Sequence, residues 1–162
     1  MKQNIQTFPV SLLLADDDKD DRFFFQDVLS KLTVRTVLTT VDDGEKLMSY
    51  LTKNAKNLPS ALFLDFNMPR RNGFECLMDI KADKLLQSLP VIMYSTSLNE
   101  TVADELYKIG AHYYIRKTSL NDLSSILDYV LNMLTEDILI KPSREGFILH
   151  PGDPQLLLAK SR

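Results

Sequence analysis

The chain has 162 residues, a formal net charge of −3 and 44% hydrophobic residues. This length and composition suit one compact domain with a single core and argue against disorder of the whole chain. The mild acidity gives no reason to expect binding to nucleic acid. One cysteine, Cys76, cannot form an internal disulfide, residues 1–8 lack the apolar stretch of a signal peptide, and no apolar run is long enough to span a bilayer. A cytoplasmic location with no membrane contact is therefore the default expectation.

Short apolar runs alternate with longer amphipathic segments through residues 10–134, which is typical of βα units around a parallel sheet. The expected strands cover residues 10–15, 35–41, 61–64, 91–94 and 113–115. The expected helices begin after Asp20 or Asp21, at Asp43-Gly44, near Phe74, near Asn99 and at Ser119. These five βα pairs predict an α/β fold with a doubly wound, five-stranded parallel sheet and five helices.

Residues 135–162 differ in composition from the part before them. Five proline and glycine residues interrupt two apolar pieces, at 147–149 and 156–158. This segment is too short to form a second domain with a core of its own. We therefore expect one domain over residues 1–134 and a C-terminal tail over 135–162, which packs on the sheet, joins a partner chain or is disordered.

Polar residues gather where the expected strands end. In chain order they are Asp16, Asp17, Asp65, Ser95, Thr96 and Lys117. In a doubly wound parallel sheet, ligands bind beyond the carboxyl ends of the strands. Crowded carboxylates repel one another, so a bound cation relieves them. Ligands that are all oxygen select magnesium or calcium, and a few carboxylates that leave positions open for water and phosphate favour magnesium.

An aspartate in such a place can act as a nucleophile toward phosphorus and form an acyl phosphate. The incoming phosphoryl group spreads negative charge over its oxygens, so it needs a cation, an ammonium group and a hydroxyl donor. Lys117 can supply the ammonium group and Ser95 the hydroxyl. The sequence thus holds every part of a phosphoryl-accepting site at one end of the sheet.

The segments at 12–17 (LLLADD) and 62–69 (LFLDFNMP), together with Gly73, Ser95 and Lys117, resemble the receiver domains of bacterial two-component response regulators. The resemblance covers about residues 10–134. Each motif alone is weak, but all of them in the family's order are specific. The resemblance implies a flavodoxin-like sheet with strand order 2-1-3-4-5, and a single-domain protein of the chemotaxis type.

The resemblance also implies a role for each acidic residue. Asp65 is the expected phosphoacceptor. Asp17 and Asp65 are expected to contact Mg²⁺ directly, with the backbone carbonyl of Asn67 as a third ligand and Asp16 acting through water. Lys117 is expected to pair with the Asp65 carboxylate and then with the phosphoryl group.

Further expectations from the family concern switching and partners. Ser95 is expected to move toward a phosphoryl oxygen, and Tyr114 to change its burial in step. The expected partners are a sensor histidine kinase or a phosphotransfer protein and a downstream protein, and a second copy of the chain is an alternative partner. No DNA-binding or catalytic output region is expected, so the output is expected to be a protein contact.

The chain departs from the family after the lysine, where proline with a cis peptide bond is common and this sequence has Thr118. A cis bond before a residue other than proline costs about 2.5–4 kcal/mol. We therefore expect a trans Lys117–Thr118 bond with an adjusted loop. Because of this departure, the direction in which the Lys117 side chain points stays open.

Two other functions stay open. A pseudo-receiver, which binds partners without accepting phosphate, is favoured only by Thr118. A phosphatase of the haloacid-dehalogenase type would need a second acid where Asn67 stands and a nucleophile after the first strand, so it fits less well. The chain is expected to remove its own phosphoryl group slowly at most, and it is not expected to be an enzyme. Asp18, Asp20 and Asp21 are interpreted as helix-capping residues and as favourable charge at the amino end of a helix. His112 and His150 are given no role.

Overall fold

The computed structural model describes residues 8–97 and 99–159. Its strands form one sheet in the order β2-β1-β3-β4-β5-β6, and every neighbouring pair is parallel. The strands are β1 (Val10–Ala15), β2 (Thr36–Val41), β3 (Ala61–Leu64), β4 (Val91–Ser95), β5 (Tyr113–Arg116) and β6 (Ile148–Leu149). The expected α/β fold with strand order 2-1-3-4-5 is confirmed, and a sixth strand extends it.

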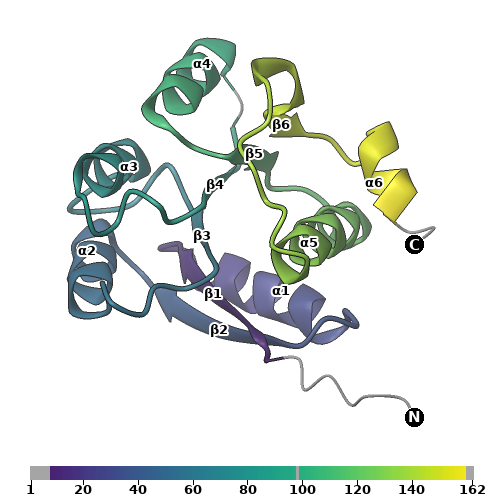
Figure 1. Cartoon of the computed structure of the whole chain (residues 1–162), viewed down its shortest axis with the longest axis horizontal. Coiled ribbons are helices and arrows are strands. Elements are labelled where there is room, and N and C mark those ends of the chain that lie inside the picture. The colour runs from purple at the N-terminus through teal and green to yellow at the C-terminus, as the bar shows by residue number, and fades with distance from the viewer. Residues whose placement is uncertain (1–7, 98, 160–162) are drawn as a thin grey trace.

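Helices cover both faces of this sheet (Figure 1). The helices are α1 (Lys19–Ser30), α2 (Gly44–Lys53), α3 (Gly73–Ala82), α4 (Glu100–Ile109), α5 (Leu120–Thr135) and α6 (Pro154–Ala159). One core cluster joins the sheet to α2, α3 and α4, and a second joins it to α1, α5 and α6. All residues of β3 and β4 are buried, as expected for central parallel strands with continuous apolar runs.

The strand register brings the carboxyl ends of the strands to one edge. Ala15 at the end of β1 is opposite Leu64 at the end of β3, and Ser95 at the end of β4 is opposite Arg116 at the end of β5. The polar residues that follow these ends therefore share one rim of the sheet. Hydrogen bonds between the strand backbones fix this register.

Side-chain caps start the helices close to this rim. The Asp18 carboxylate accepts from the backbone N–H groups of Asp20 and Asp21, so Asp18 caps α1. Of the three acids interpreted as capping residues, Asp18 is confirmed, and the expectation that α1 begins after Asp20 or Asp21 is wrong. Aspartate is a good N-cap residue, so the side chains of Asp18, Asp20 and Asp21 are equally suitable. Asp18 is the cap because its backbone is extended and the helix begins directly after it. Asp43 caps α2 as expected.

The tail packs on the domain and adds a short 3₁₀ helix (Arg144–Gly146), β6 and α6. It thus supplies one strand and one α-helix beyond the five expected of each. Phe147 is fully buried between the rings of Tyr107 and Tyr114. Arg144 forms ion pairs with Glu100 and Asp104 of α4. Residues 160–162 lie outside the described part, so their share of the predicted tail is not described.

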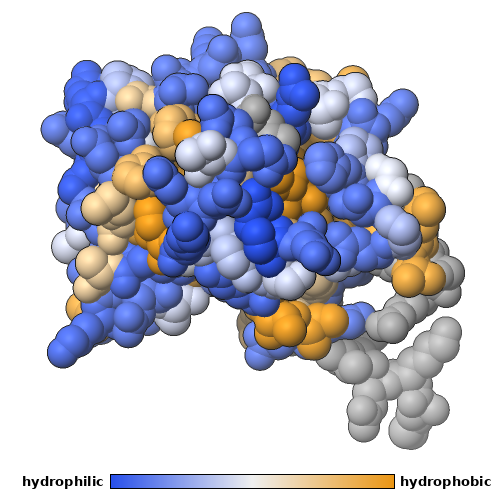
Figure 2. Space-filling model, turned by 90° about the horizontal axis from the view of Figure 1, so that it is seen from above, coloured by the Kyte–Doolittle hydropathy of each residue, from blue (hydrophilic) through white to orange (hydrophobic). Residues whose placement is uncertain are grey.

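The surface seen from above is mainly hydrophilic, and hydrophobic side chains show in separate patches between the polar ones (Figure 2). None of the described helices is both long and apolar enough to cross a membrane.

Candidate functional site

Three carboxylates meet at the rim. Asp16 and Asp17 directly follow β1 and Asp65 directly follows β3, and ligand atoms from all three lie within 4.8 Å of one another. Asp16 and Asp65 are buried, whereas Asp17 is exposed. Such a group of oxygens, open to solvent on one side, fits a hard divalent cation that keeps several water ligands.

Burial shapes the protonation of this cluster. Burial raises the pKa of Asp65 to about 6, because the charge of Lys117 offsets only part of the desolvation and the charges of Asp16 and Asp17 add to the rise. Burial also raises the pKa of Asp16, against hydrogen bonds from Lys117 and Asp18. The cluster therefore carries unfavourable negative charge near neutral pH, and a cation would relieve it.

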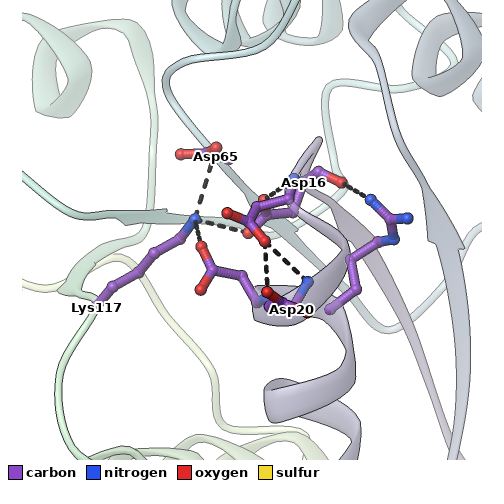
Figure 3. A network of polar contacts seen from close by, with 7 residues as sticks. Asp16, Asp20, Asp65 and Lys117 are labelled. Carbon is purple, nitrogen blue, oxygen red and sulfur yellow. Dashed lines mark hydrogen bonds and ion pairs between the residues drawn. The ribbon is translucent and has the colours of Figure 1, made fainter.

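Lys117 reaches this cluster from the end of β5 (Figure 3). Its Nζ lies 2.7 Å from Asp16 Oδ2 and 3.6 Å from Asp65 Oδ2. Burial lowers the pKa of Lys117, but hydrogen bonds to Asp16 and Asp21 outweigh it, so that pKa lies above its usual value and the amine is charged. The ammonium group expected from the sequence therefore lies beside the candidate nucleophile.

The departure at Thr118 leaves Lys117 directed into the site. The described backbone holds no cis peptide bond, so Lys117–Thr118 is trans, as expected. The backbone N–H of Lys117 donates to the carbonyl of Ser95, which fixes the strand end. Thr118 Oγ1 and Ser119 Oγ both bond Asp122 Oδ2, which holds the following loop against α5.

One contact in the site was not expected from the sequence. Asp21 Oδ2 lies 2.8 Å from Lys117 Nζ, so Asp21 is an acid of the site as well as a residue of the first turn of α1. Asp21 does not cap the helix, but it does place negative charge in the first turn, as expected. The sequence holds no signal for its contact with Lys117, because the two residues are 96 positions apart.

The loop from Asp65 to Gly73 is held closely against the site. A Cβ atom on Gly73 would lie 2.2 Å from the carbonyl oxygen of Asp65, so only glycine fits. Arg70 Nη1 lies 2.9 Å from the buried Asp43, which ties the loop to α2. A backbone hydrogen bond of Asn67 acts to lower the pKa of Asp65, so Asn67 lies beside that carboxylate.

The two expected switch residues lie in neighbouring strands. Ser95 is the last residue of β4 and is buried, and its Oγ has no hydrogen-bond partner in the described residues. Tyr114 in β5 is also buried, and its hydroxyl donates to the carbonyl of Ser97 just beyond β4. Burial raises the pKa of Tyr114, and a side-chain hydrogen bond of Ser95 to its ionised form acts to lower that pKa by less, so the two hydroxyl groups are neighbours.

The chain matches the family model of the response regulator receiver domain over residues 12–130. It is 29% identical over 135 residues to response regulator Rcp1 of Synechocystis sp., which covers 80% of this chain and 92% of that protein. It is 30% identical over 137 residues to a chemotaxis protein CheY homologue of Campylobacter jejuni, which covers 85% of this chain and 98% of that protein.

Solved structures give the same result. The phosphorylated cyanobacterial phytochrome response regulator RcpA aligns with a TM-score of 0.72 and 31% identity over 80% of this chain and 96% of its own. The Mn²⁺-bound form of Rcp1 aligns with a TM-score of 0.71 and 28% identity over 83% of this chain and 100% of its own. With a matching family model, these similarities show that the chain belongs to the response regulator receiver family.

Proposed function

We propose that this receiver accepts a phosphoryl group on Asp65 from a phosphohistidine of a sensor histidine kinase or of a phosphotransfer protein. The single observation that carries the proposal is the position of the Lys117 ammonium group, 3.6 Å from the Asp65 carboxylate inside a cluster of three acids. With a pKa of about 6, Asp65 is mostly ionised at neutral pH and can attack phosphorus. Its oxygen forms the new bond while the bond from phosphorus to the histidine nitrogen breaks and its electron pair stays on the imidazole.

Asp17 and Asp65 would hold a magnesium ion directly, with the backbone carbonyl of Asn67 as a third ligand and Asp16 acting through water. The bound ion would supply positive charge to the phosphoryl oxygens. The oxygen-only donor set supports magnesium, and Rcp1, a relative, has a Mn²⁺-bound form. Lys117 would neutralise a further phosphoryl oxygen.

The new charge of about −1.5 to −2 would then act on the neighbouring strands. Ser95 Oγ, buried and without a partner in the described residues, would turn toward a phosphoryl oxygen. Tyr114 would change its packing in step, because its hydroxyl is bonded to Ser97, two residues beyond Ser95. The output would be a changed protein-binding surface for a downstream partner or a second copy of the chain. We place this signalling in the cytoplasm, with no more than slow autodephosphorylation.

The test is incubation of the purified chain with acetyl phosphate and Mg²⁺, followed by intact mass measurement. We expect a gain of one phosphoryl group in the wild type and none in Asp65→Asn. Asp27→Asn, which removes the same charge from the exposed ion pair with Lys31, is the matched control and is expected to be phosphorylated. An unmodified wild type would reject the proposal and favour a pseudo-receiver, whereas sustained release of phosphate would favour a phosphatase.

A further inference from the structure

The ammonium group of Lys117 is divided among three carboxylates. Its Nζ lies 2.7 Å from Asp16, 2.8 Å from Asp21 and 3.6 Å from Asp65. A lysine ammonium group has three N–H donors. The candidate nucleophile, Asp65, is therefore the most distant of the three acceptors, and Asp21 is nearer to the amine than Asp65 is.

Asp16 and Asp21 are not equivalent partners. Asp16 is fully buried, its other oxygen accepts from the backbone N–H of Asp18, and it belongs to the cluster of three acids. The Asp21 side chain is 34% exposed and lies outside that cluster. Asp21 can therefore pair with Lys117 whether or not the cluster holds a cation. Because it is partly exposed, water can solvate its carboxylate when the lysine moves away.

The backbone around Lys117 is held in place, so only its side chain is free to move. The backbone of Lys117 is bonded to Ser95, and the loop that follows is held by Asp122. The Nζ atom lies 5.2 Å from the centroid of the Tyr94 ring, which borders the amine on the side of α1 and α5. The ammonium group already lies 3.6 Å from Asp65, so a move from Asp21 toward Asp65 requires only the side chain to change position.

We propose that Asp21 is a positioning residue that competes with the phosphoryl group on Asp65 for the ammonium group of Lys117. In the unmodified protein, the ion pair with Asp21 keeps the ammonium group near Asp65 but closer to Asp21. After phosphoryl transfer the doubly charged group attracts the lysine away from Asp21. The competition lowers the stability of the phosphorylated state, and the inference rests on the proposed function.

The test compares Asp21→Asn with Asp20→Asn, its matched control. Asp20 lies in the same turn of α1, and its replacement removes the same charge, but in the described structure it forms no ion pair with Lys117. The probe is beryllium fluoride, a phosphoryl mimic, titrated at saturating Mg²⁺ and followed by tyrosine fluorescence. We expect Asp21→Asn to bind it about fivefold more tightly than wild type, and Asp20→Asn within twofold of wild type.

Two further measurements separate the outcomes. Asp21→Glu keeps the carboxylate and is expected to bind within twofold of wild type. In metal-free protein, the ¹⁵Nζ resonance of Lys117 is expected to shift in Asp21→Asn but not in Asp20→Asn, which tests the contact independently of phosphoryl chemistry. Equal or weaker binding by Asp21→Asn relative to Asp20→Asn would overturn the competition. A wild type that binds no beryllium fluoride would instead reject the proposed function.

Discussion

The ring of Phe147 packs edge-on against the ring of Tyr114, with centroids 6.5 Å apart and planes at 72°. Phe147 lies in the tail, and Tyr114 is the expected switch residue of β5. The ring of Tyr107 in α4 lies 5.3 Å away on another side of Phe147. The C-terminal segment therefore completes the core beside the strand that is proposed to respond to phosphorylation.

Replacement of Phe147 by alanine tests how much this packing stabilises the domain. Phe147→Ala removes a fully buried ring and leaves a cavity between Tyr107 and Tyr114, so we expect the free energy of unfolding to fall by about 3–5 kcal/mol. Urea unfolding followed by circular dichroism measures the change. Phe23→Ala, at a ring that is 75% exposed, is the control and is expected to shift stability by no more than about 0.5 kcal/mol. Equal effects of the two would show that the tail does not pack as described.

The ion pairs of Arg144 are expected to contribute much less than this ring. Its partners Glu100 and Asp104 are more than half exposed, and solvent screens such pairs. Arg144→Ala is therefore expected to cost less than about 1 kcal/mol of stability. A double-mutant cycle of Arg144→Ala with Asp104→Ala measures the coupling, which should also weaken as salt is added. A coupling of several kcal/mol would show that charge, and not the apolar contact, holds the tail.

Asp65 is expected to lower the stability of the metal-free protein at neutral pH. Its pKa is raised from 3.8 to about 6 by burial, so between these pH values the folded state binds more protons than the unfolded state. The contribution of Asp65 to the free energy of unfolding therefore falls as the pH rises from about 4 to 6, and it stays low at higher pH. We expect Asp65→Asn to unfold with a free energy about 1–3 kcal/mol higher than wild type at pH 7.

The comparison is made in EDTA at several pH values. The advantage of Asp65→Asn over wild type should shrink toward zero as the pH falls to about 4. Taking the difference cancels other groups, among them His112, whose pKa burial lowers to about 4 and whose contribution has the opposite sign. An advantage that did not depend on pH would mean that the Asp65 carboxylate is not desolvated.

Magnesium is expected to stabilise the wild type at pH 7, because binding to the folded state alone shifts the unfolding equilibrium. At a hundred times the dissociation constant the gain is about 2.7 kcal/mol. Asp17→Asn should lose most of this gain. Asp18→Asn removes the same charge beside the site but keeps a good helix cap, so it should retain the gain. Thermal unfolding with Mg²⁺ and then EDTA measures both, and equal responses of the two variants would place the cation elsewhere.

Much of the site was predictable because the strands of a parallel sheet end at one edge. The buried runs that lead to Asp16 and Asp65 are continuous in hydrophobicity, so both strand ends could be placed from sequence. The pairing of Asp21 with Lys117 spans 96 positions, and no local pattern indicates it. The sequence could not predict which of Asp18, Asp20 and Asp21 caps α1 either, because all three have a suitable side chain.

The tail shows a different limit of sequence interpretation. β6 has only two residues, Ile148 and Leu149, so no alternation could reveal a strand. It forms because Tyr114 and Ile115 of β5 present an open edge with which it pairs. The family resemblance could not indicate it, since it covers only about residues 10–134.

Gly73 offers a test of how the loop after β3 supports the nucleophile. A Cβ atom there would lie 2.2 Å from the carbonyl oxygen of Asp65 and 2.9 Å from Cα of Phe66, and backbone atoms cannot move aside cheaply. Gly73→Ala is therefore expected to lower the free energy of unfolding by about 1–3 kcal/mol and to displace Asp65. The backbone N–H of Gly73 also donates to the carbonyl of Phe66, so a displacement would open the loop.

The displacement should slow modification by acetyl phosphate more than the loss of stability explains. Phosphorylation is therefore measured by intact mass at a temperature where Gly73→Ala is fully folded by circular dichroism. Gly152→Ala is the control, because a Cβ atom at Gly152 meets no heavy atom within 4 Å, and it should match wild type in both measurements. Folded Gly73→Ala that accepts phosphate at the wild-type rate would show that the position of Asp65 does not depend on this close contact.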